Sequence, residues 1–334
     1  MRRIWRGWWL ATGTGALVLL ALASLAIGSR PIPLATALDA LRAYDPGNDL
    51  HLIVRELRVP RLITAVFAGA ALGVAGAIMQ AVTRNPLAEP GLLGINAGAA
   101  VAVVLGVTVL GLTRPTHYVW LAALGAGLAG SAVFLLGRAH ETGTNPVRLV
   151  LAGAGLSIVL GAITGIAVIN APATAFDNFR HWAAGSVEGA SFEAVAVLSV
   201  CVVAGFLVAL SVVGGLNALA LGQELGQALG AAPHRIWLAA CLAVMLLAGA
   251  ATATAGPIGF VGLIAPHLSR ALLGTDHRWI LPGAGLAAAI LLLGADLLGR
   301  VVAAPSEVAA GIVAALVGGP FFIMAVRRFR VSRP

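Results

Sequence analysis

The amino-acid sequence predicts an all-α membrane protein with about ten transmembrane helices. Of its 334 residues, 60% are hydrophobic and only 10% are charged, and the mean hydropathy is +0.97. Soluble domains are about 45–50% apolar and about 25% charged, so lipid rather than water must surround most of this chain. The apolar residues also form runs of about 20, the length at which a helix crosses about 30 Å of hydrocarbon. We therefore treat residues 1–334 as one transmembrane domain.

The basic residues exclude ATP hydrolysis by this chain. All 21 Lys+Arg positions are arginine. A P-loop requires a lysine that reaches the β- and γ-phosphates, so ATP would have to be hydrolysed by another polypeptide. The net charge of +8 does not indicate nucleic-acid binding, because the positive-inside rule places arginines beside transmembrane helices.

The first predicted span is the apolar stretch 8–27. This stretch is longer than the roughly 7–15 apolar residues of a secretory signal peptide. Trp5, Trp8 and Trp9 stand where an interfacial aromatic belt would lie. We therefore interpret the stretch as a retained helix with a cytoplasmic N-terminus, rather than as a cleaved signal peptide.

The second predicted span, 60–82, carries a face of small residues. Gly69 and Gly73 form a GxxxG pair, which Gly76 and Ala77 extend. Small residues at this spacing let another helix approach closely. We expect this span to be buried among other helices rather than exposed to lipid.

Eight further apolar runs complete the prediction. They cover approximately 92–112, 118–137, 149–169, 192–213, 236–254, 257–273, 279–298 and 307–326. The run at 257–273 is short and is interrupted by glycines and Pro266. With this alternation both termini lie in the cytoplasm.

Three connecting segments are long enough to carry function. Residues 29–57 and 170–190 are predicted to be periplasmic loops, the first with a short helix near 34–41. Residues 214–234 are too polar and too rich in glycine to span, and we expect two short amphipathic helices at the cytoplasmic surface. Their leucines are Leu216, Leu219, Leu225 and Leu229, and their polar residues are Gln223, Glu224 and Gln227.

Arginines at the outer ends of two spans depart from the positive-inside rule. Arg55, Arg58 and Arg61 precede or begin the second span, and Arg300 lies at the end of the ninth. Two interpretations are open: arginine can snorkel to lipid headgroups, or it can bind the carboxylates of an acidic partner. Asp296 stands four residues before Arg300, and such an i,i+4 pair can orient the arginine.

No residue pattern indicates catalysis or a bound cofactor. The histidines show neither an HExxH motif nor an i,i+4 pair of metal ligands, and no nucleophile–base pattern is visible. Cys201 and Cys241 each lie in an apolar run, where we expect them to pack as small hydrophobic residues. We expect no catalytic residue, no cofactor and no metal site, so the chain is not predicted to be an enzyme.

Six sequence motifs resemble the FecCD family of ABC import permeases, which carry ferric siderophores, haem and cobalamin. They are RVPR (58–61), GAALGVAGAIMQ (69–80), NPLAEPGLLG (85–94), AGPIGFVGLIAPHLSR (255–270), GTDHR (274–278) and GGPFFI (318–323). The resemblance implies a type II ABC importer permease fold in the bacterial inner membrane. It further implies a homodimer with two copies of a cytoplasmic ATPase and one periplasmic substrate-binding protein. A ferric siderophore is the commonest cargo in the family, with haem and cobalamin as alternatives.

The resemblance also implies roles for particular residues. The binding protein would dock through glutamates on its two lobes onto Arg58, Arg61 and Arg300. Residues 214–234 would contact the ATPase and couple it to the membrane helices. The coupling residues would be Leu221, Gln223, Glu224, Leu225 and Gln227.

The same resemblance places the transport pathway between the two copies, mainly along the fifth span. Thr144 and Asn145 would form the gate, and Ser157, Thr164 and Asn170 would line the pathway. The alternative for each polar residue of the span is a hydrogen bond to its own helix, which is common for such residues within membranes.

Residues 69–94 can be aligned weakly with 249–274. Under the predicted topology the two segments enter the membrane from opposite sides, as the inverted repeats of transporters do.

Two rival classes of protein function remain open. An ion-coupled secondary transporter would need ionisable residues near the bilayer midplane, whereas the charges here stand at the ends of the spans. A membrane-embedded enzyme would need a catalytic cluster.

Overall fold

The structure, a computed structural model, describes residues 2–112, 115–137 and 146–328. Every regular element in these ranges is a helix, which confirms the all-α prediction. Seven described helices are long and apolar enough to cross a membrane, and three shorter apolar helices bring the number to the ten expected. The seven are α1 (Arg2–Ala26), α4 (Val59–Thr83), α6 (Pro115–Leu136), α7 (Pro146–Ile169), α9 (Phe192–Ala220), α11 (Pro233–Ala255) and α13 (His277–Val302). The three are α5 (Ile95–Thr108), α12 (Val261–Leu273) and α14 (Ala310–Arg328).

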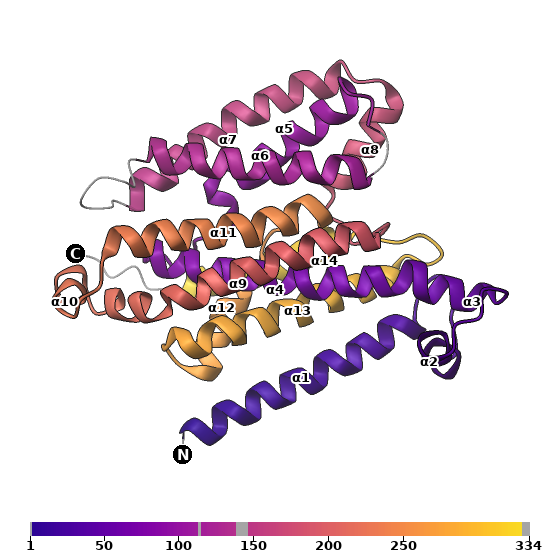
Figure 1. Cartoon of the computed structure of the whole chain (residues 1–334), viewed down its shortest axis with the longest axis horizontal. Helices are drawn as coiled ribbons and strands as arrows, with labels where there is room; N and C mark the ends of the chain where they lie inside the picture. Colours follow the sequence, from indigo (N-terminus) through magenta and orange to yellow (C-terminus); the bar gives the residue numbers. More distant parts are fainter. Residues whose placement is uncertain (1, 113–114, 138–145, 329–334) are drawn as a thin grey trace.

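Helix α4 lies in the middle of the bundle, packed against α9, α11, α12 and α13 (Figure 1). Its GxxxG face touches the backbone of α13. A Cβ added at Gly69 would lie 2.7 Å from the carbonyl oxygen of Ala288, and one added at Gly73 would lie 2.3 Å from that of Ala284. Lipid supplies no hydrophobic drive for helix association, so close packing of this kind must hold the helices together. The predicted burial of this span is confirmed.

Helices α5 and α12 are shorter than the spans predicted at 92–112 and 257–273. Their 14 and 13 residues extend about 20 Å, less than the about 30 Å of the hydrocarbon core. A non-helical break precedes each helix. The 3₁₀ turn η2 (Pro90–Leu93) ends at Gly94, and the second break runs from Gly256 to Phe260, all three with positive φ. An α-helix cannot continue through such residues, so both helices begin late. Helix α5 also ends early, at Thr108.

The predicted loop 29–57 contains the expected short helix, α2 (Leu34–Arg42), but its end is helical as well. Helix α3 (Asp49–Leu52) and the π-helical turn η1 (Ile53–Arg58) run without interruption into α4. The Asn48 side chain accepts a hydrogen bond from the N–H of Leu50 at 3.0 Å and so caps this extension. The predicted loop 170–190 contains α8 (Ala173–Ala183).

The prediction of two short helices in 214–234 is wrong. Helix α9 continues to Ala220, and the separate helix described there is α10 (Gln223–Ala228). Gly222, with φ of 116°, divides them. The extension of α9 packs on α11, because Gly215 leaves room for Ile236, whose side chain would lie 2.4 Å from an added Cβ.

Helices α1 and α7 lie on opposite sides of the molecule (Figure 1). Helices α5, α6 and α7 form a layer over α11, and α1 contacts mainly α13 on the other side. Both outer helices leave large apolar side chains exposed, among them Trp8 and Leu19 of α1 and Ile158 and Ile166 of α7. In a membrane, lipid or another subunit covers such faces.

Substitution of Gly76 tests the close packing of α4 against α12. A Cβ at this position would lie 1.8 Å from the carbonyl oxygen of Gly262 on α12. Overpacking of a core typically costs about 1–3 kcal/mol, and here the obstacle is backbone that cannot rotate away. We expect Gly76→Ala to lower Tm in detergent and the yield of monodisperse protein. The control is Gly161→Ala on α7, where an added Cβ meets nothing within 4 Å. An unchanged Tm for Gly76→Ala would contradict this helix contact.

Candidate functional site

Arg58, at the junction of η1 and α4, joins the outer end of α1 to the bundle. Its side chain is only 6% exposed. Nη1 donates to the backbone oxygen of Leu25 at 2.5 Å, and Nη2 donates to that of Arg30. The guanidinium therefore supplies hydrogen bonds to one carbonyl in the last turn of α1, where the helix leaves carbonyls unpaired, and to one in the segment after it.

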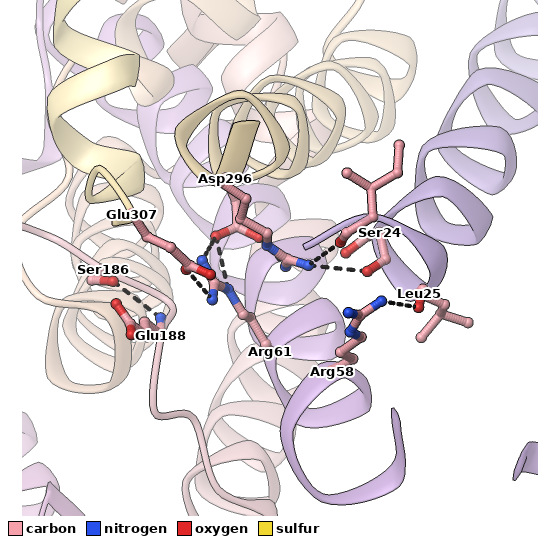
Figure 2. A network of polar contacts seen from close by, with 10 residues as sticks. Ser24, Leu25, Arg58, Arg61, Ser186, Glu188, Asp296 and Glu307 are labelled. Atoms are coloured by element: carbon pink, nitrogen blue, oxygen red, sulfur yellow. Dashed lines mark hydrogen bonds and ion pairs between the residues drawn. The ribbon is translucent and has the colours of Figure 1, made fainter. Parts of the chain in front are cut away.

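Arg61 lies one turn further along α4 and connects it to α13 and to the segment after α13 (Figure 2). Its Nε and Nη2 donate to Asp296 Oδ1 at 2.9 and 2.7 Å. Its Nη1 donates to Glu307 Oε2 at 2.6 Å. One arginine thus holds two carboxylates.

Arg300 completes the network. Its Nη2 donates to Asp296 Oδ2, so the predicted i,i+4 contact is present. Its Nη1 donates to the backbone oxygens of Ser24 at 3.0 Å and Ile27 at 3.3 Å. Three arginines therefore tie the end of α1 to α4 and α13.

Asp296 is the centre of this network and is 1% exposed. A buried ion is expensive to desolvate, and its partners must offset that cost with well-formed hydrogen bonds. Here both carboxylate oxygens are bonded, one by Arg61 and the other by Arg300. We call Arg58, Arg61, Arg300, Asp296 and Glu307 the outer arginine cluster.

The outer arginine cluster lies beside a cleft of about 390 Å³. The charged side chains that line this cleft are those of Arg30, Arg58, Arg61, Glu188, Arg300 and Glu307. The three predicted docking residues are therefore brought together, but Arg58 and Arg300 are buried, and a partner could reach them only through the cleft. Arg55 lies outside the cluster and stacks over Tyr44 at 4.5 Å.

Helix α10 and the residues that flank it carry an exposed apolar surface. Leu221, Leu225 and Leu229 are each more than half exposed, and Leu225 is 61% exposed. The predicted polar residues Gln223, Glu224 and Gln227 are exposed on the same short segment. Gly226 faces the end of α9, where an added Cβ would lie 3.1 Å from the carbonyl oxygen of Ala218. Helix α10 is thus fixed on one side and uncovered on the other.

A hydrogen-bond network that the sequence did not reveal supports α9 just before α10. Asn217 Nδ2 donates to Asp276 Oδ1 at 2.7 Å, and the N–H of His277 donates to Asn217 Oδ1 at 3.0 Å. The N–H of Arg278 bonds Asp276 and lowers the pKa of that carboxyl. The GTDHR motif at 274–278 could have indicated that Asp276 caps the N-terminus of α13, because Asp is a strong helix N-cap residue.

Two of the predicted pathway residues, Thr164 and Asn170, bond to the backbone of α7. Thr164 Oγ1 donates to the backbone oxygen of Leu160 at 3.0 Å, and Asn170 Nδ2 donates to that of Ile166 at 2.7 Å. Ser157 faces the chain itself, since an added Cβ at Gly94 would lie 3.7 Å from its Oγ. Thr144 and Asn145 lie outside the described residues.

A polar contact between buried Gln80 and half-buried Arg270 links two of the sequence motifs. Gln80 Nε2 donates to the backbone oxygen of Leu263 at 3.2 Å, and Arg270 Nη2 donates to Gln80 Oε1. Gln80 ends the motif at 69–80 and Arg270 ends the motif at 255–270. Within the described residues, no group of three or more His, Cys, Asp or Glu side chains could hold a metal ion.

Comparison with known proteins identifies a family and several relatives that resemble this chain. Residues 16–328 match the model of the FecCD transport family. The chain is 42% identical over 318 residues to the ferric enterobactin transport system permease protein of Escherichia coli (strain K12), covering 94% of both chains. It is 38% identical over 325 residues to the iron(3+)-hydroxamate import system permease protein of Bacillus subtilis (strain 168), covering 96% of this chain and 83% of that one.

A third relative is the hemin transport system permease protein of Yersinia pestis, at 37% identity over 323 residues and 95% and 94% coverage. The fold is also similar to a solved inward-facing conformation of a metal-chelate type ABC transporter, with a TM-score of 0.81 and 27% sequence identity. That match covers 96% of this chain and 99% of the other. The family resemblance inferred from the six motifs is confirmed.

Asp296 tests the energetic role of the outer arginine cluster. Breaking a buried ion pair typically costs about 3–5 kcal/mol, whereas an exposed pair contributes about 0–1 kcal/mol. We expect Asp296→Asn to lower Tm in detergent strongly. The control is Asp177→Asn, which breaks the exposed pair with Arg180 on α8 and should leave Tm nearly unchanged. Equal effects of the two substitutions would show that the cluster does not stabilise the fold.

Proposed function

This chain belongs to the FecCD transport family, and we propose from that premise that it is the permease of an ABC importer whose cargo is a ferric siderophore. The choice of a ferric siderophore as cargo rests on the 42% identity, over 94% of both chains, to a ferric enterobactin permease. Haem is the second candidate, because a hemin permease matches at 37% identity over nearly the whole chain. Cobalamin, the other cargo implied by the motifs, ranks behind these two.

We propose that two copies of the chain form the transporter in the bacterial inner membrane, with both termini in the cytoplasm. Two copies of a separate ATPase subunit would hydrolyse ATP, since the chain has no lysine for a P-loop. One periplasmic substrate-binding protein would deliver the cargo. The exposed apolar face of α7, where Ile166 is 66% exposed, supports contact with a second copy or with lipid.

The binding protein is proposed to dock at the cleft of the outer arginine cluster. Arg58, Arg61 and Arg300 converge there from two helices that are far apart in sequence. A guanidinium favours carboxylates, which it binds with two parallel hydrogen bonds. The burial of Arg58 and Arg300 means that an acidic side chain of the partner must enter the cleft instead of meeting the arginines at the surface.

The ATPase is proposed to seat on α10 through Leu221, Gln223, Glu224, Leu225 and Gln227. Leucines exposed on a short helix at the cytoplasmic surface gain by burial against a partner. Movement of α10 would pass to α9, on which it packs, and through Asn217 to α13. This gives a physical connection between ATP-driven closure of the ATPase and the membrane helices.

The pathway is proposed to lie between the two copies along α7, with the gate at Thr144 and Asn145 and with Ser157, Thr164 and Asn170 nearby. The cargo would pass by alternating access, in which the same path opens first outward and then inward. A bulky chelate must also leave the path again, which is easier where no strong ligand cluster holds its metal.

An ion-coupled secondary transporter is the alternative of another class, and an uptake assay separates the two. The chain is reconstituted into liposomes with its ATPase partner and binding protein, and ferric siderophore, haem and cobalamin are offered in turn. We expect ATP-dependent uptake of ferric siderophore and no uptake with a non-hydrolysable ATP analogue. Uptake that follows a proton or sodium gradient and ignores ATP would rule out the ABC mechanism.

Leu225 tests the coupling surface. Because it is 61% exposed in this chain, Leu225→Asp should fold normally. A carboxylate forced into an apolar contact costs several kcal/mol, so ATP-dependent uptake should fall by more than about tenfold, and the ATPase should no longer co-purify. The matched control, Leu225→Met, keeps the side chain apolar and should retain both properties. Normal co-purification of the ATPase with Leu225→Asp would exclude α10 as the ATPase-binding surface.

A further inference from the structure

The hydrogen bonds of Arg61 go to two carboxylates in different surroundings (Figure 2). Nε and Nη2 bind Asp296, whose side chain is 1% exposed. Nη1 binds Glu307 at 2.6 Å, and the Glu307 side chain is 16% exposed at the edge of the cleft. Asp296 is also held by Arg300, so its removal would leave two guanidinium groups, those of Arg61 and Arg300, without this partner. Glu307 is therefore the carboxylate that can be exchanged.

Glu307 can leave Arg61 without disturbing the backbone around it. It lies in the non-helical segment between α13 and α14. The next residue, Val308, is fixed to α13: its N–H donates to the backbone oxygen of Gly299 at 3.0 Å, and a Cβ added at Gly299 would lie 2.2 Å from the oxygen of Val308. Release of Arg61 thus requires a rotation of the Glu307 side chain and leaves the segment in place.

The departure of Glu307 would leave a strongly positive cleft. Arg30, Arg58, Arg61 and Arg300 line it, and Glu188 would be the remaining carboxylate of the lining. The Nη1 edge of Arg61 would then face the cleft without its ion-pair partner. A buried guanidinium edge of this kind is expensive to leave unpaired, so the cleft would favour an incoming carboxylate over any neutral group.

We propose that Glu307 is an internal occupant of the docking site, and that a carboxylate of the substrate-binding protein replaces it on Arg61 Nη1 during docking. This inference rests on the proposed docking function and names the residue that regulates it. The exchange keeps Arg61 paired in both states. It also rejects a partner surface that has no carboxylate to offer, and the return of Glu307 helps the partner to leave.

The test measures the affinity of the full transporter, with its ATPase in lipid nanodiscs, for the substrate-binding protein that supports uptake through this chain. We compare the wild type with Glu307→Gln and Glu307→Ala. Gln retains an oxygen that can accept from Arg61 and so preserves the fold, while Ala removes the occupant entirely. We expect both variants to bind about tenfold more tightly, which corresponds to about 1.4 kcal/mol of binding free energy.

The control is Asp177→Asn on α8, at the same end of the molecule as the cluster (Figure 1). It removes the same charge and frees an exposed arginine, Arg180, from a 3.4 Å ion pair, so it should change the affinity by less than about twofold. Tm is measured for every variant. Equal gains for Asp177→Asn and Glu307→Gln, or a loss of affinity in the Glu307 variants at unchanged Tm, would overturn the proposal. If the wild type fails to bind the protein that supports uptake, the proposed docking function falls as well.

Discussion

The close approach of α4 to α12 and α13 is the constraint on which the rest of the structure depends. Gly69, Gly73 and Gly76 place backbone against backbone, and in lipid such packing replaces the hydrophobic effect as the force between helices. The same approach decides the geometry of the outer arginine cluster. Arg61 is on α4 and Asp296 is on α13, so their 2.7 Å contact exists only while these helices stay in register.

The outer arginine cluster joins three helices and also lines the cleft proposed as the docking site. The bonds to Asp296 and to carbonyls in the last turn of α1 hold three helices. The outward bond to Glu307 lies at the cleft, where a partner can compete for it. Buried ion pairs seldom add net stability over apolar packing. The proposed docking of an acidic partner would give these arginines a role beyond stability.

The exposed surfaces of the chain are of two kinds, apolar faces on α1 and α7 and a mixed apolar and polar face at α10. The exposed faces of α1 and α7 are apolar along membrane-spanning lengths, which suits lipid or a second copy. The exposed face of α10 and its flanking residues combines Leu221, Leu225 and Leu229 with glutamine and glutamate, which suits a protein partner. The contacts from α10 through α9 and Asn217 to α13 connect that surface with the helix that carries Asp296.

The sequence by itself determined the helical membrane class, the long spans, the buried small face of α4 and the family, because each of these depends on composition or on motifs within one segment. It also singled out Arg58, Arg61 and Arg300, and it identified the Asp296–Arg300 pair from its i,i+4 spacing. It missed the late starts of α5 and α12, which depend on positive φ at Gly94, Gly256 and Phe260. Only the tertiary structure decided that Arg61 also holds Asp296 and Glu307, more than 200 residues away. Such contacts arise from how distant helices pack, and no local pattern records that packing.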